Sequence, residues 1–124
     1  MLRVLEAIRR RDVAALQAEV TPDFELHPLV TVWTRTYVGH SGVEAWQRDL
    51  AGLWDEFAID LDDLRTPGGD ALVVVGRWRG TPRDAAAPME GPIAAVIRFE
   101  GDKVKSADVF LHEAEAEAAA KPAP

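Results

Sequence analysis

The stretch Thr36–Trp46 reads TYVGHSGVEAW and changes character at its centre. Its first residues are aromatic and β-branched, which is typical of the end of a strand. Ser41 is followed three residues later by Glu44, the spacing of a capping box in which each side chain accepts the other residue's backbone N–H. We therefore expect a helix to begin at Ser41. His40 then stands just before the cap, where we expect it to turn the chain rather than to act in catalysis.

An apolar stripe follows this corner. Five side chains recur at the spacing of one helix face: Val43, Trp46, Leu50, Leu53 and Trp54. The pattern predicts an amphipathic helix with one buried side. Tryptophans on such a stripe usually belong to a core, but a core wall can also line a cavity. Trp46 and Trp54 are thus candidates for a ligand-binding wall.

Two short helices are predicted before the corner. Their apolar residues lie at helical spacing: Leu2, Leu5 and Ile8, then Val13, Leu16 and Val20. Asp12 can cap the second helix, which we expect to run to about Val20. A strand is expected at Phe24–His27, and Leu29–Tyr37 is expected to be extended or a loop.

After the long helix, apolar residues recur at every second position, as they do in β-strands. Strands are expected from Phe57 to the turn at 67–70, and over 71–80, 93–100 and 104–112. The last two are joined by a tight turn at Gly101–Asp102. The expected order is helix, helix, strand, helix, a three-stranded antiparallel meander and a final Ala/Glu helix over 113–121.

Composition limits the class of protein. The 124 residues are 48% hydrophobic and 28% charged, as expected for one globular domain, which we place at residues 1–121 with a disordered tail at 122–124. The chain has no cysteine and 3 dispersed histidines, which argues against a metal site, and nothing indicates a cofactor. A net charge of −7 has the wrong sign for nucleic acid. No run approaches the roughly 18 apolar residues of a membrane span, and no signal peptide is evident, so we expect a cytoplasmic protein with no membrane partner.

Several segments together resemble one superfamily. They are Arg11–Leu16, Pro22–Pro28, Tyr37–Val43, Arg77–Gly80, Gly101–Val104 and Phe110–Leu111. In this order and spacing they resemble the NTF2-like superfamily and, within it, the SnoaL-like proteins, which include relatives of polyketide cyclases and ketosteroid isomerases. The resemblance implies an α+β cone in which N-terminal helices pack inside a curved antiparallel sheet.

The same resemblance leaves the activity open, because the superfamily hosts isomerases, cyclases, hydrolases and non-catalytic modules. Its polyketide-cyclase-like members carry a cavity-facing histidine on the penultimate strand and an aspartate on the last strand. Ala95 and Val109 occupy these positions here, and neither side chain can move a proton. The other register would turn Asp108 inward as a weak catalytic candidate. The apolar pattern instead favours a wall of Ala107, Val109 and Leu111.

His27 is the best remaining candidate for a general base. It alternates with Leu26 on the first strand, and the pattern does not decide which of the two faces the cavity. In one interpretation His27 is a base at the cavity mouth, paired with Glu25 or Tyr37. In the other it is a half-exposed residue at a strand end. Tyr37 either donates a hydrogen bond to a substrate carbonyl or packs with its hydroxyl in water.

The strand at 71–80 leaves a similar choice. If Arg77 faces inward, it selects an anionic ligand. If it faces outward, it pairs with acidic neighbours and Trp78 helps to line the cavity. Both faces of this strand are apolar over most of its length, so the convex side needs a cover. We expect a partner subunit to supply it, in a homodimer formed through the sheet.

These observations predict a SnoaL-like protein that binds a small apolar or aromatic molecule in an apolar cavity. One alternative is a non-catalytic dimeric module whose cone is filled by its own side chains. A further alternative is an isomerase or cyclase acting on an apolar ring compound. An enzyme of this kind, whether isomerase, cyclase or hydrolase, would use general acid/base chemistry without a metal.

Overall fold

The computed structural model describes residues 2–28, 36–68, 71–84 and 87–120. Its elements are α1 (Leu2–Arg10), α2 (Val13–Ala18), β1 (Val20–His27), β2 (Tyr37–Val38), α3 (Gly39–Leu53), β3 (Trp54–Gly68), β4 (Ala71–Pro82), β5 (Met89–Glu100), β6 (Lys103–Phe110) and α4 (Glu113–Ala120). Most of the expected loop at 29–37, the turn residues 69–70 and the tail at 122–124 lie outside the described residues.

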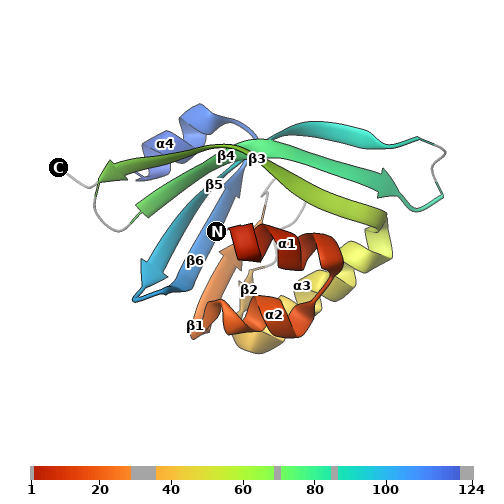
Figure 1. Cartoon of the computed structure of the whole chain (residues 1–124), viewed down its shortest axis with the longest axis horizontal. Helices are drawn as coiled ribbons and strands as arrows, with labels where there is room; N and C mark the ends of the chain where they lie inside the picture. Colours follow the sequence, from red (N-terminus) through yellow and green to blue (C-terminus); the bar gives the residue numbers. More distant parts are fainter. Residues whose placement is uncertain (1, 29–35, 69–70, 85–86, 121–124) are drawn as a thin grey trace.

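The six strands form one curved sheet in the order β2-β1-β6-β5-β4-β3. The sheet bends over α1, α2 and α3, while α4 lies on its opposite side (Figure 1). Neighbouring strands pair antiparallel, except that β1 runs parallel to β6. The predicted α+β cone is confirmed, with a mixed rather than a wholly antiparallel sheet. All four strand segments expected after the long helix form, as the antiparallel meander β3 to β6, so the expected number of three strands is corrected to four.

The first two helices begin as expected. The Asp12 carboxylate accepts a hydrogen bond from the Ala15 N–H at 3.0 Å and so caps α2. The second helix is shorter than predicted, because Val20 already belongs to β1 and pairs with Val104 of β6. The Val104 N–H donates to the Glu19 carbonyl at 2.9 Å, so sheet pairing begins directly after the helix ends.

The expected capping box does not form. α3 begins at Gly39, two residues early, and its N-cap Val38 makes no side-chain capping bond. Gly39 has φ of +70°, which lets the chain turn before it reaches Ser41. His40 Nε2 lies 3.4 Å from the Val20 carbonyl oxygen, and the His40 carbonyl accepts a hydrogen bond from Gln17 Nε2 at 2.8 Å. His40 therefore makes backbone contacts that tie the corner to β1 and α2.

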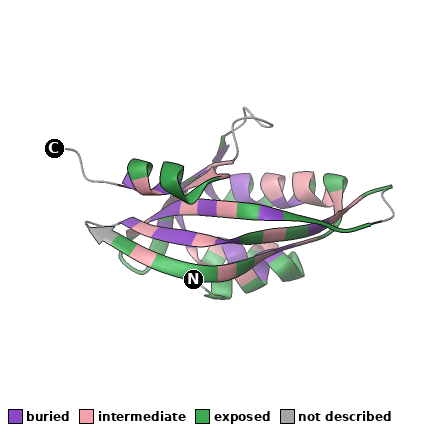
Figure 2. Cartoon of the chain, turned by 90° about the horizontal axis from the view of Figure 1, so that it is seen from above, coloured by how far each residue is buried: buried purple, intermediate pink, exposed green. Residues whose placement is uncertain are grey.

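Two apolar clusters lie on opposite sides of the sheet. The larger joins the first three helices to the concave face, with Ile8, Phe24, Val43, Val74 and Ile97 among its buried members. The smaller lies on the convex face. It consists of Ala71, Val73, Ala94 and Val96 of the sheet and Ala116 and Ala120 of α4, with Val75 and Phe110 packed against it. Five of the eight α4 residues are exposed, whereas the strands of the sheet show alternating buried, intermediate and exposed residues (Figure 2).

The position of α4 changes the argument for a partner subunit. The apolar residues on the convex face of the sheet, which we expected a partner subunit to bury, already pack against α4 of the same chain. Within the described helices, none is long and apolar enough to cross a membrane. A homodimer through the sheet stays a prediction, but it is no longer needed to bury Val73 and Val96, which are 0% and 1% exposed.

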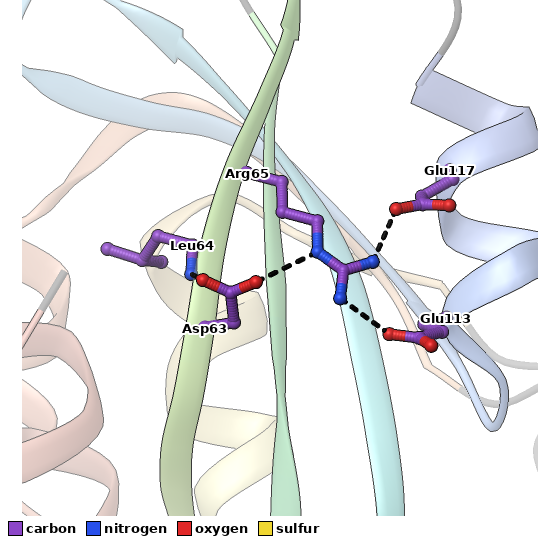
Figure 3. A network of polar contacts seen from close by, with 5 residues as sticks. All are labelled: Asp63, Leu64, Arg65, Glu113 and Glu117. Carbon is purple, nitrogen blue, oxygen red and sulfur yellow. Dashed lines mark hydrogen bonds and ion pairs between the residues drawn. The ribbon is translucent and has the colours of Figure 1, made fainter.

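Arg65 of β3 holds α4 against the sheet (Figure 3). Its guanidinium lies 2.9 Å from Asp63 Oδ2 and 2.9 Å from Glu113 Oε2, and it also donates to Glu117. The hydrogen bond to Asp63, followed by that to Glu117, raises the pKa of Arg65, and the bond from Arg65 lowers the pKa of Asp63. A single cation therefore bridges two carboxylates of α4 and one of its own strand.

We expect Arg65→Met to loosen α4 without unfolding the sheet. The apolar stem is kept and the ion pairs are lost, so backbone amides over 113–120 should exchange with solvent several-fold faster. Hydrogen–deuterium exchange measured peptide by peptide checks this result. Arg9→Met is the matched control, because Arg9 pairs with Glu6 on α1, far from α4 in the fold. Unchanged exchange in α4 of the Arg65 variant would show that alanine packing alone holds the helix.

Candidate functional site

An apolar pocket of about 390 Å³ lies between the helices and the concave face of the sheet. Every helix and strand from α1 to β6 contributes to its wall. The described lining residues are aliphatic or aromatic, except for proline and one charged side chain, Asp49. Protein interiors seldom contain voids much larger than a water molecule, so a space of this size is a candidate ligand site.

Aromatic rings form one end of this pocket, where α3 turns into β3. The Trp54 ring lies 5.5 Å from Trp78 in an edge-to-face arrangement and 5.8 Å from Phe57. Trp46 lines the same pocket from α3. The Trp78 indole nitrogen lies over Gly91, where an added Cβ would come within 2.7 Å of it. The candidates Trp46, Trp54 and Trp78 thus line the same pocket, and Trp54 and Trp78 are in direct ring contact.

A hydrogen-bonded pair supplies the polar part of the pocket. The Tyr37 hydroxyl donates to Asp49 Oδ2 at 2.5 Å, and both residues line the pocket. Tyr37 comes from β2 and is 3% exposed, while Asp49 comes from the third turn of α3 and is half-buried. This bond differs from the predicted role of Tyr37, in which its hydroxyl would face water or a substrate carbonyl.

Sequence reasoning missed Asp49. The available signal was its place on the apolar stripe, three residues after Trp46 and four before Leu53. Residues at these spacings share a helix face, so a lone carboxylate there is directed toward the buried side. Its partner Tyr37 could not be inferred, because the two residues meet only when β2 packs beside α3.

His27 and Asp108 lie away from the pocket. Phe24 and Leu26 of β1 line it, so the intervening side chains face the other side of the sheet. His27 Nε2 is 3.9 Å from Asp108 Oδ1 and 3.9 Å from a Glu25 oxygen, and its Nδ1 is 3.3 Å from the Thr36 hydroxyl. The structure therefore brings the two catalytic candidates together, but not at the cavity.

Arg77 also faces outward. It lies 3.2 Å from Glu90, and the neighbouring Arg79 hydrogen-bonds Asp60, which lowers the pKa of that carboxyl group. The inward position of this segment is taken by Trp78. Arg77 therefore does not face the pocket, where it would select an anionic ligand. Its side chain instead follows the other interpretation, in which it points outward and pairs with an acidic neighbour.

The last two strands present an inert wall. Ala95 and Val109 are directly paired across β5 and β6, and both line the pocket. Ala107 and Leu111 line it as well, as the apolar pattern predicted. The positions that carry an acid and a base in polyketide-cyclase-like proteins therefore hold only aliphatic groups. Within the described parts of the chain, no cluster of three or more His, Cys, Asp or Glu side chains could hold a metal ion.

A curved sheet wrapped around three helices, with an apolar pocket between them, defines the class of NTF2-like α+β proteins. The sequence profile of the SnoaL-like domain matches residues 1–107, and the chain belongs to this family. The match ends before α4. No curated relative matches the chain.

Solved structures agree with this assignment. An NTF2-like protein from Burkholderia thailandensis is 28% identical over 98% of this chain and 94% of its own, with a TM-score of 0.75. A protein of ketosteroid isomerase-like fold from Catenulispora acidiphila, in complex with trimethylamine, is 15% identical over 99% and 92%, with a TM-score of 0.80. A putative SnoaL-like polyketide cyclase from Jannaschia is 15% identical over 99% and 90%, with a TM-score of 0.72. The predicted resemblance to the NTF2-like and SnoaL-like proteins is confirmed.

Proposed function

We propose that this SnoaL-like protein binds a small, apolar, ring-bearing molecule in the pocket between its helices and its sheet. The observation that carries the proposal is an apolar space of about 390 Å³ walled by aromatic side chains. Pockets for small ligands have volumes of roughly 300–1,000 Å³ and combine apolar walls with a few oriented polar groups. The Tyr37–Asp49 pair is the oriented polar group here.

The fold relatives support small-molecule binding on this scaffold. The Catenulispora protein holds trimethylamine within the same fold. The volume of the pocket also argues against the alternative of a module whose cone is filled by its own side chains, because such a module would leave no space of this size.

Proton transfer is a second candidate function, favoured by one observation. Asp49 is the charged group among the described lining residues, and Tyr37 orients it through a short hydrogen bond. A carboxylate held in an apolar pocket is the kind of group that removes a proton from carbon in isomerases and cyclases. In this proposal Asp49, and not His27 or Asp108, is the general base.

Binding is tested first with naphthalene, a rigid apolar ring compound small enough for the pocket. We expect naphthalene to raise the melting temperature of the protein, because a ligand that binds the native state stabilises it by mass action. His27→Ala should respond equally, since His27 faces away from the pocket. Isothermal titration calorimetry gives the affinities. If naphthalene binds neither the parent protein nor the His27 variant, the proposed cavity function is refuted. If only the His27 variant fails to bind, the ligand site lies on the outer face of the sheet.

A further inference from the structure

Three glycines surround Trp78 on the inner face of the sheet. Gly76 and Gly80 stand two residues before and two residues after it on β4, so they share its face. Gly91 of β5 is its direct partner on the neighbouring strand. Glycine inside a strand weakens the strand, and it often marks a place where a ligand or another part of the chain approaches closely. Each of these glycines should therefore have a neighbour that needs the space.

Two of the three glycines make room for tryptophan rings. A Cβ added at Gly91 would lie 2.7 Å from Nε1, 3.1 Å from Cε2 and 3.2 Å from Cζ2 of Trp78. A Cβ added at Gly80 would lie 2.6 Å from Cε3 and 2.9 Å from Cζ3 of Trp54. Such distances are shorter than an ordinary van der Waals contact, so each ring occupies the space of a missing side chain. The third glycine, Gly76, faces main chain instead.

These contacts hold the two indoles close to the sheet. Trp78 rests on its cross-strand partner Gly91, and Trp54 meets it edge-to-face with 5.5 Å between the ring centroids. Both rings line the pocket between the sheet and the helices. Because the strand backbone lies beneath the Trp78 ring, a side chain at position 91 would push the ring away from the sheet. The ring would then enter the pocket.

We propose that Gly80 and Gly91 are positioning residues that set the size of the ligand, an inference that rests on the proposed binding function. They let Trp54 and Trp78 lie against the sheet, which keeps the aromatic end of the pocket open. A flat compound of three fused rings is then accepted, and not only one of two. The apolar volume of about 390 Å³ has room for such a compound, and its further ring buries more apolar surface against the indoles.

Naphthalene and phenanthrene, which have two and three fused rings, measure this limit. The fluorescence of each ligand, followed as protein is added, gives its affinity. In the parent protein we expect phenanthrene to bind at least as tightly as naphthalene, because it buries more apolar surface. In Gly91→Ala the displaced Trp78 ring shortens the pocket. We expect phenanthrene to bind at least about tenfold more weakly there, while the affinity for naphthalene changes by less than about threefold.

A second substitution shows whether Gly91 acts through the tryptophan ring. Trp78→Leu keeps an apolar side chain that is shorter than the indole, so the methyl group of an alanine at position 91 meets no ring. In the Trp78→Leu background, Gly91→Ala should change the affinity for phenanthrene by less than about threefold. Gly52→Ala is the matched control for an added methyl group, because no atom lies within 4 Å of its would-be Cβ. Both of its affinities should equal those of the parent.

Gly80→Ala gives an independent measurement if Gly91→Ala does not fold. The added Cβ displaces Trp54 in the same way, so phenanthrene should again lose more affinity than naphthalene. Gly91 is the cleaner position, because the three atoms nearest to its added Cβ all belong to one side chain. At Gly80 the third of these atoms is the backbone oxygen of Glu56, at 3.1 Å.

The outcomes have distinct meanings. If the parent binds naphthalene but not phenanthrene, or if the glycine variants weaken both ligands equally, the size-setting role is refuted while the cavity function stands. A lower melting temperature with an unchanged ratio of the two affinities would show that the glycines serve packing alone, which also refutes the role. If neither ligand binds the parent protein, both the proposed function and this inference fail.

Discussion

Replacing Gly76 with alanine is expected to destabilise the protein by roughly 3 kcal/mol, the upper range for overpacking in a well-packed interior. A Cβ at Gly76 would lie 2.1 Å from the backbone oxygen of Asp60 and 3.2 Å from its carbonyl carbon. The obstacle is main chain, so no side-chain rotation relieves the clash. β3 and β4 must separate where Gly76 pairs with Leu61, next to a shift in strand register.

Thermal denaturation followed by circular dichroism tests this expectation, with a fall in melting temperature of about 10 °C for a domain of this size. Gly52→Ala is the matched control. Gly52 lies in α3 with no atom near its would-be Cβ, so alanine there should leave stability unchanged or raise it by about 0.5–1 kcal/mol. A Gly76 variant as stable as the parent would show that the two strands do not approach this closely.

Ala95→Phe should abolish ligand binding while leaving the fold intact. Ala95 lines the pocket and pairs with Val109 in the middle of the sheet wall, so a phenyl ring there projects into the space that a ligand would use. We expect naphthalene to bind at least about 30-fold more weakly, which corresponds to ~2 kcal/mol. Filling an apolar cavity often raises stability by about 0.5–2 kcal/mol, so the melting temperature without ligand should not fall.

The control for the Ala95→Phe variant is Arg77→Gln. Arg77 lies on the outer face beside Glu90, and its loss should not change the affinity for naphthalene. Calorimetric titration of both variants gives the comparison. If the Ala95 variant binds naphthalene with the affinity of the parent protein, the ligand does not occupy this pocket. If the Arg77 variant loses binding, Arg77 faces the ligand and the outward orientation of its side chain is wrong.

Much of the fold could be predicted because its signals are local. The Asp12 cap, the stripe from Val43 to Leu53 and the alternation on β4 each depend on residues a few positions apart. The capping box at Ser41 failed for a local reason as well. A glycine with positive φ two residues earlier competes with it as the helix start, and close packing of the strand end against Gly42 supports that early turn.

The candidate site was predicted only in part, because alternation along a strand defines two faces without saying which one is buried. On β4 it separated Trp78 from Arg77, and on β1 it separated Leu26 from His27. The choice between the faces depends on where the helices lie. The packed structure placed the apolar side chains against the helices and left His27 and Arg77 on the outer face.

The sequence by itself determined the α+β class, the family, most of the helices and strands without their exact bounds, and the aliphatic character of the wall at Ala95 and Val109. These follow from short-range periodicity and from motifs that are contiguous in the chain. The tertiary structure alone decided the Tyr37–Asp49 pair, the parallel contact of β1 with β6 and the cover that α4 provides. Each of these joins segments that are distant in sequence, and such contacts are selected by the packing of the whole chain because no local pattern encodes them.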